Sequence, residues 1–300
     1  MSTVLISTAP ARGHLYPMMD VALALRESGH RVVVQTLADE RPNLTAAGVE
    51  HRAIDPAIES IELLNALRAE LGVAPLAGQP DLYLRSDALL YRTAEPFEYP
   101  HRDWHSTVHL IGPGLWPPPA DPPEWLAELP HLRVLLSVST QLQQDGAIIE
   151  AALRGLADDP GSIIVTTAAL DPESFTAPHD RTRIARFLPH ASVMDHVDLV
   201  VTHGGMGTTQ RALAAGVFLV VVPWGRDQKE AARRVQHSGA GVPIPPSRLA
   251  PERIRRAARQ ALTCAPQAGA IAAAFAAAGG ALRGSQVIEE LLRPAPRPVS

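Results

Sequence analysis

A stretch of thirty residues, 199–228, places the strongest limits on how this chain of 300 residues folds. It reads LVVTHGGMGTTQRALAAGVFLVVVPWGRDQ. Two short apolar runs, at 198–202 and 218–222, are rich in β-branched residues and predict buried strands. Helical spacing between them completes a β-α-β unit of a parallel sheet. Ligands of such sheets bind outside the carboxyl ends of the strands, where this stretch carries its polar residues.

The turn after the first strand has the composition of an anion-binding site. Its candidate residues are His203, Gly204, Gly205, Gly207, Thr208 and Thr209. Glycines let the backbone approach an anion, the N–H groups at the helix start can bind it, and the hydroxyls and the imidazole can donate hydrogen bonds. No Gly-Lys-Ser/Thr ending follows, which excludes a Walker-type phosphate loop. The alternative is a glycine turn that only packs the helix on the strand.

The order and spacing of these residues resemble the donor-binding signature of family 1 nucleotide-sugar glycosyltransferases. The matching parts are HGGMGTTQ, ALAAG and VVVPWGRDQ, and FLPHA at 187–191 continues the match upstream. Bacterial macrolide and antibiotic enzymes and plant secondary-metabolite enzymes belong to this family. The resemblance implies an α/β protein of the GT-B fold, with two Rossmann-like parallel-sheet domains facing across a cleft.

The resemblance also implies a domain organisation. Residues 1–112 form an N-terminal acceptor domain, residues 113–130 a proline-rich linker, and residues 131–300 the nucleotide-sugar donor domain, whose final helix crosses back. The acceptor domain is shorter than is usual in the family, and the missing part lies between about 60 and 81. The acceptor pocket is therefore open, unusually small, or completed by a second subunit in a homodimer.

His14 is the candidate catalytic base. Apolar runs at 4–7 and 32–34 predict two strands, with a loop at 8–13 and a helix at 17–28 between them. In the family a Gly-His pair in this loop deprotonates the acceptor hydroxyl, and a neutral imidazole suits that role. The alternative is a helix-capping or surface histidine. Three acids could orient the base, with no motif to choose among them: Asp81, Asp87 and Asp103.

In the donor domain the resemblance assigns further contacts. The predicted donor-binding residues are Thr140, His190, His203, Gly205, Gly207, Thr208, Thr209, Asp227 and Gln228. Thr140 would face the diphosphate, because Ser139 replaces the usual glycine. His190 stands where the family has glutamine beside the nucleotide base. The acceptor and donor atoms of Asp227 and Gln228 suit sugar hydroxyls, although Asp227 can also cap the helix predicted at 228–238.

Two positions depart from the family's pattern. Arg211 stands where the family often has a glutamate that binds the ribose hydroxyls, and Ala231 replaces a usual asparagine. A guanidinium cannot accept a hydrogen bond. The ribose is therefore held in another way, or Arg211 pairs with phosphate.

Composition agrees with a cytoplasmic enzyme. A net charge of −4 carries no signature of a nucleic-acid or membrane partner, and a single cysteine cannot form an internal disulfide. The N-terminus lacks the basic region of a signal peptide. No apolar run reaches the ~20 residues of a membrane span.

The resemblance implies that a sugar moves from a UDP- or TDP-linked donor to a hydroxyl of a small lipophilic natural product. The reaction would invert the anomeric carbon and need neither metal nor cofactor, since no Asp-x-Asp motif is present. One alternative is a catalytically inactive nucleotide-sugar-binding relative that acts as partner or regulator of a full-length enzyme. Another is epimerisation of a nucleotide sugar on a related scaffold.

Overall fold

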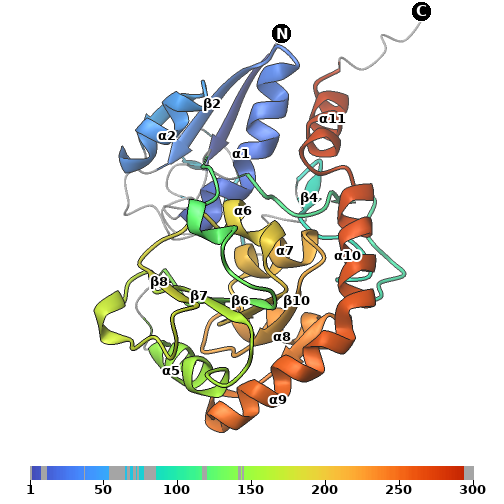
Figure 1. The fold of residues 1–300 in the computed structure, drawn as a ribbon. Helices are drawn as coiled ribbons and strands as arrows, with labels where there is room; N and C mark the ends of the chain where they lie inside the picture. The colour runs from blue at the N-terminus through green and yellow to red at the C-terminus, as the bar shows by residue number, and fades with distance from the viewer. Residues whose placement is uncertain are drawn as a thin grey trace, which may run out of the picture. The chain divides into compact units, whose positions relative to one another are not determined.

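The computed structural model describes residues 2–7, 12–36, 38–53, 65, 68–69, 72, 74–77, 86–116, 120–140, 143 and 145–293. The chain divides into two compact units (Figure 1). The first comprises Met1–Arg92, His101–Trp116 and Ala278–Ser300. The second comprises Thr93–Pro100 and Pro117–Ala277. The chain therefore passes from one unit to the other four times.

The first unit is built on a parallel sheet of order β1-β2-β3. Its elements are β1 (Thr3–Ser7), α1 (Arg12–Glu27), β2 (Arg31–Thr36), α2 (Arg41–Ala46) and β3 (Glu50–Ala53). Apolar residues of α1 and β2 form the core because they recur on one face of each element. A separate parallel pair joins β4 (Leu89–Tyr91) to β5 (Val108–Leu110). The last helix, α11 (Gly280–Leu292), packs against α1.

The predicted strands of this unit are present, but its first helix begins earlier than predicted. The sequence predicts a loop at 8–13 and a helix from Pro17, whereas α1 begins at Arg12 and contains Pro17. Proline is favoured in the first turn, which is why it suggests a helix start. The sequence also predicts a helix at 58–71, most of which lies outside the described residues.

The second unit contains a parallel sheet of order β11-β10-β9-β6-β7-β8. Its strands are β6 (Arg133–Ser137), β7 (Ser162–Thr166), β8 (Thr182–Ala185), β9 (Leu199–Thr202), β10 (Phe218–Val221) and β11 (Gly241–Pro243). Every residue of the four central strands is buried, as expected when helices cover both faces. The registers pair Ser137 with Thr166 and with Thr202, so these strands end level.

These strands are connected by the helices α5 (Gly146–Gly155), α6 (His190–Val193), α7 (Met206–Ala214) and α8 (Gln228–His237). Strand β11 is followed by α9 (Pro251–Ala261) and α10 (Ala265–Ala277). Short 3-10 turns lie at Ala38–Glu40, Glu124–Leu126, Pro172–Ser174, Met194–His196, Pro246–Arg248 and Leu262–Cys264. Helix α5 packs against α9, while α7 packs against α10 and α8.

The direction of the sheet changes between β6 and β9. From β6 the chain proceeds outward to β7 and β8, returns to β9 beside β6, and proceeds outward again to β10 and β11. Right-handed crossovers then carry α5 and α7 to opposite faces. The loops after β6 and β9 diverge, and this switch point is where open parallel sheets bind ligands.

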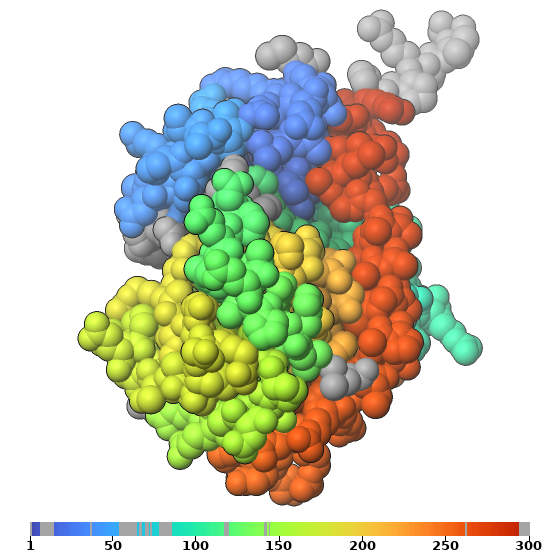
Figure 2. All heavy atoms as spheres, viewed as in Figure 1, coloured from blue at the N-terminus to red at the C-terminus, as the bar shows by residue number. Residues whose placement is uncertain are grey.

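The stretch Ala265–Leu292 is long and apolar enough to cross a membrane by length and composition alone. It is broken into α10 and α11 at Gly279 and Gly280, whose φ angles are 82° and 52°. A pair of adjacent glycines predicts such a break. Helix α10 lies on the surface of the second unit in Figure 2 and buries only Ala268, Ile271 and Phe275.

Candidate functional site

The turn after β9 requires glycine at two positions for packing reasons. Gly204 has a φ of 93°, and a Cβ there would lie 2.8 Å from Cγ1 of Val221. A Cβ on Gly205 would lie 2.6 Å from Nε2 of His203, so this ring packs beneath the turn. Gly207 is different, because a Cβ there would meet nothing within 4 Å. Packing therefore accounts for Gly204 and Gly205 but leaves Gly207 to be explained by another requirement.

Helix α7 begins in this turn without a side-chain cap. Its N-cap is Gly205, which has no side chain, and the first-turn N–H groups have no acceptor within the helix. Such an N-terminus attracts anions. Thr208 is partly exposed there, whereas Thr209 is fully buried and its Oγ1 is covered by protein. Of the two predicted threonines, Thr208 is the one that faces outward.

His203 lies at the switch point of the sheet and is 8% exposed. Burial lowers the pKa of His203, while the carboxylates of Asp145 and Asp227 and a hydrogen bond with the Ser137 backbone act in the opposite direction. Asp227 occupies the N-cap position of α8, but its side chain makes no capping hydrogen bond there. The loops after β6, β9 and β10 thus bring Asp145, His203 and Asp227 together, of which only Asp145 was not predicted.

Gln228 is buried, and its amide is engaged within the protein. Its Oε1 accepts the backbone N–H groups of Trp224 and Gly225 at 2.8 and 3.0 Å. Its Nε2 donates to Oε1 of Gln143 at 3.0 Å. Sequence reasoning assigned this amide to sugar hydroxyls and overlooked Gln143. The structure gives Gln228 protein partners on both sides of the amide.

The loop after β6 is closed by Asp145, which is 1% exposed. Oδ2 of Asp145 accepts the backbone N–H of Ser139 at 2.7 Å and Nε2 of Gln143 at 3.1 Å. Thr140, the predicted diphosphate contact, is exposed in this loop. Asp145 directly precedes α5 but makes no side-chain cap bond to it.

His190 connects three elements. Its Nε2 lies 3.2 Å from Oγ1 of Thr166 at the end of β7, and its Nδ1 lies 3.5 Å from Oγ1 of Thr208 in α7. Burial, together with the positive charge of Arg211 and the nearby His203, lowers the pKa of His190 to about 4. His190 is therefore neutral at pH 7 and acts as a hydrogen-bonding bridge, not as a cation.

Arg211 places a guanidinium beside His190. Burial lowers the pKa of Arg211, and the carboxylate of Asp195 opposes that shift. The sequence predicts a strand at 184–188, whereas β8 ends at Ala185, so Phe187 lies beyond the strand with 68% of its surface exposed. Phe187 stands out in the sequence as an aromatic residue just before the Pro-His pair, although no role was predicted for it.

The catalytic candidates of the first unit are less fully described. His14 lies in the first turn of α1, and its side chain is outside the described part of the structure. Asp81 also lies outside the described residues, while Asp87 and Asp103 are exposed. The assignment of His14 as base stays a prediction.

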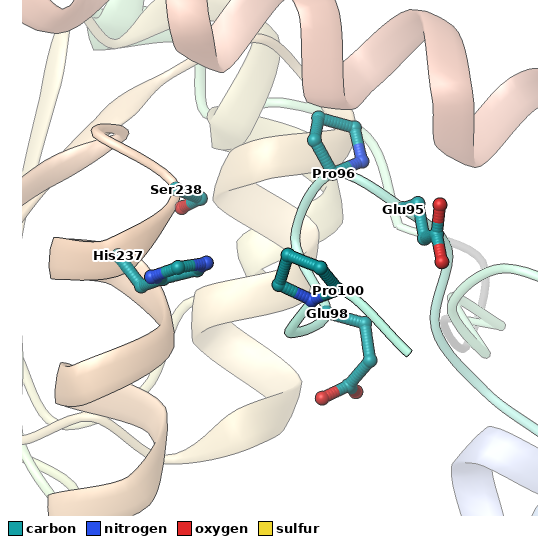
Figure 3. A pocket seen from close by; sticks show the side chains of 6 residues that line it. All are labelled: Glu95, Pro96, Glu98, Pro100, His237 and Ser238. Carbon is teal, nitrogen blue, oxygen red and sulfur yellow. The ribbon is translucent and has the colours of Figure 1, made fainter. Parts of the chain in front are cut away.

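A hollow of about 260 Å³ lies between the segment 95–100 and the end of α8 (Figure 3). In that view the carboxylates of Glu95 and Glu98 point away from His237 and Ser238. Glu98 instead pairs with Nε of Arg234 at 3.1 Å. None of the predicted donor-binding residues lines this hollow. Among the described residues no group of three or more His, Cys, Asp or Glu side chains is arranged to hold a metal ion.

A family model and several curated proteins match parts of this chain. The family described as "Erythromycin biosynthesis protein CIII-like, C-terminal domain" matches residues 150–279. The 4'-demethylrebeccamycin synthase of Lentzea aerocolonigenes is 39% identical over 188 residues, 61% of this chain and 42% of that protein. A PGL/p-HBAD biosynthesis glycosyltransferase of Mycobacterium tuberculosis is 29% identical over 201 residues, 67% of this chain and 46% of that protein. The chain thus spans about half the length of the curated relatives it matches.

Solved structures share the fold over nearly the whole chain. The calicheamicin glycosyltransferase CalG4 has a TM-score of 0.76 and 18% identity, with 98% of this chain and 99% of that chain covered. The glycosyltransferase VinC in complex with DTDP has a TM-score of 0.74 and 18% identity, with the same coverage. The chain therefore has the GT-B fold with a small N-terminal sheet, and its residues 150–279 are similar to the EryCIII-like C-terminal domain.

Proposed function

We propose that this protein transfers a sugar from a UDP- or TDP-linked donor to a hydroxyl of a small lipophilic natural product. The observation that carries the proposal is the position of His203. It lies at the switch point of the donor sheet, beside the uncapped start of α7, with Asp145 and Asp227 facing it. Open parallel sheets bind their ligands at such a switch point, outside the carboxyl ends of the strands.

The diphosphate binds at the start of α7. The first-turn N–H groups, the Thr208 hydroxyl and an N–H of His203 donate to its oxygens, and the open space at Gly207 permits close approach. Negative charge develops on the diphosphate as the sugar leaves, so donors held in place there lower the barrier. A bound anion also favours protonation of His203, against the effect of burial.

The nucleoside binds toward β7 and β8. The exposed ring of Phe187 offers a face on which a pyrimidine can stack. Arg211 donates to ribose or phosphate oxygens, since it cannot replace the acceptor function of a glutamate. The neutral His190 holds Thr208 against the end of β7.

His14 deprotonates the acceptor hydroxyl, which displaces the diphosphate from the opposite face of the sugar and inverts the anomeric carbon. The helix terminus and His203 stabilise the leaving group, so the displacement proceeds without a metal. A second copy of the chain completing the acceptor site, and a cytoplasmic location, belong to the same proposal.

A second candidate is a nucleotide-sugar-binding partner of a full-length enzyme without activity of its own. Arg211 in place of a ribose-binding glutamate favours it. Acceptor turnover that His14→Ala abolishes would decide for the enzyme, whereas nucleotide binding without turnover of any acceptor would decide for the partner.

Calorimetric titration with UDP and with TDP, without metal, tests the donor site. Saturable binding that His203→Ala weakens by more than ~1 kcal/mol is expected, as for loss of a charge-assisted hydrogen bond. An absence of binding to both nucleotides would refute the proposed function.

A further inference from the structure

We propose that Gln228, Gln143 and Asp145 form a positioning device for the donor site, which we call the amide bridge. In it Gln228 acts on the donor site through its protein partners. The proposal rests on the proposed function, because it specifies how that same site is held in shape.

Both acceptor directions of the Gln228 side-chain carbonyl are occupied by protein donors. Oε1 accepts two backbone N–H groups, from Trp224 and Gly225, at 2.8 and 3.0 Å. Two acceptor directions are all that a side-chain carbonyl has. Gln228 itself is 4% exposed. A sugar hydroxyl could reach this oxygen only by displacing the bonds that shape the loop after β10.

A continuous chain of hydrogen bonds runs from Gln228 to Asp145. Nε2 of Gln228 donates to Oε1 of Gln143, and Nε2 of Gln143 donates to Oδ2 of Asp145. The same Oδ2 accepts the N–H of Ser139 at 2.7 Å. The backbone at Trp224 and Gly225 is thereby linked to the backbone at Ser139 through side chains alone.

The amide bridge joins the loops that follow β10 and β6, on either side of β9. Strand β9 stands between β10 and β6, so the loops that the amide bridge joins are two strand spacings apart, about 10 Å. His203 follows β9, between the two loops. The charge of Asp145 also favours the protonated form of His203. The amide bridge therefore holds the two loops on either side of the residue proposed to bind the diphosphate.

This arrangement has a consequence that a sugar ligand would not have. If Gln228 contacted only the sugar, its loss would not affect the binding of a nucleotide without a sugar. If it positions the loops, its loss weakens binding of UDP and TDP themselves, because the backbone around the diphosphate shifts. Gln143 must then be needed to the same extent, although it was never a candidate ligand.

The experiment is a calorimetric titration of UDP and TDP into the full chain and its variants. Gln228→Ala and Gln143→Ala are each expected to raise the dissociation constant about tenfold, and the double variant by no more than about the same factor. Gln143→Glu should be worse than Gln143→Ala, since a carboxylate cannot donate to Asp145 and repels it. Gln236→Ala, an exposed glutamine of the same helix, is the matched control and should bind normally.

Each outcome decides between the two proposals. Failure of the unaltered protein to bind either nucleotide refutes the proposed function. Normal binding by the unaltered protein and by both alanine variants overturns the amide bridge. Loss with Gln228→Ala but not with Gln143→Ala also overturns it, because Gln228 then acts directly. If thermal unfolding indicates that Gln228→Ala does not fold, the Gln143 variants test the proposal instead, because Gln143 lies in a loop and is half-buried.

Discussion

Oδ2 of Asp145 accepts the backbone N–H of Ser139 at 2.7 Å and so closes the loop between β6 and α5. The same buried carboxylate favours the protonated form of His203, which follows the neighbouring strand. One acid thus fixes the backbone of one loop and opposes the lowering of the pKa of His203 by burial, without outweighing it. The hydrogen bonds from Ser139 and Gln143 satisfy this carboxylate at a position that is 1% exposed.

Asp145→Asn should lower the pKa of His203 further. The substitution removes the negative charge that stabilises the imidazolium, while burial, which favours the neutral ring, remains. The measurement is an NMR pH titration of the ring protons, with His203→Gln used to assign the resonance. Asp171→Asn, in an exposed ion pair with Arg186, serves as the control. An unchanged His203 titration in Asp145→Asn would show that the two side chains are not coupled.

His190 should make the protein less stable in mild acid. Its pKa is about 4 in the folded state against an ordinary value of 6.5, so the unfolded chain binds the proton more readily. The stability associated with the neutral ring is complete above pH 6.5 and is lost as the pH falls from 6.5 toward 4, by about 3 kcal/mol in total. Urea denaturation at several pH values measures it.

In His190→Gln the free energy of unfolding should vary less with pH over that range, because no proton is taken up at this position. His196→Gln, at an exposed histidine of the same unit, should keep the pH dependence of the unaltered protein. Equal slopes for His190→Gln and the unaltered protein would mean that His190 does not titrate as its burial requires.

Gly204→Ala and Gly207→Ala should separate folding from binding. The first places a Cβ 2.8 Å from Val221 at a φ of 93° and should cost about 1 to 3 kcal/mol of stability. The second meets no atom and should raise stability by up to about 1 kcal/mol, because alanine favours the helix. Gly207→Ala should nevertheless weaken UDP binding, since its methyl group occupies the space proposed for the diphosphate. Thermal unfolding and calorimetry together measure both effects, and tight UDP binding by Gly207→Ala would contradict the proposed close approach.

Glu98→Gln should destabilise the second unit. Glu98 pairs with Arg234 at 3.1 Å, and their side chains are 4% and 17% exposed. Loss of the carboxylate removes this ion pair from a largely buried guanidinium, which keeps a longer contact to Glu230 at 3.6 Å and its position over the Tyr99 ring, so a loss of about 2 to 3 kcal/mol is expected. Urea denaturation measures it, with the exposed Glu95→Gln of the same segment as the control. Equal stability of the two variants would refute a structural role for the pair.

The strands and helices of the second unit could be read from the sequence because their signals are local. Continuous β-branched runs predict buried strands, and the Gly279–Gly280 pair marks the break between α10 and α11. The start of α1 could not be read in the same way. Pro17 suggests a helix start, but the structure continues the helix back to Arg12.

The sequence by itself determined the β-α-β units, the glycine turn and the resemblance to the glycosyltransferases, because periodicity, turn chemistry and motif spacing reside in neighbouring residues. Only the tertiary structure decided which polar groups meet. Gln143 and Gln228 are 85 residues apart in the chain, and no local pattern pairs them. Buried donors and acceptors must find partners wherever the fold brings them together. For that reason the amide of Gln228, which suits a sugar hydroxyl in the sequence, is bonded to protein in the folded chain.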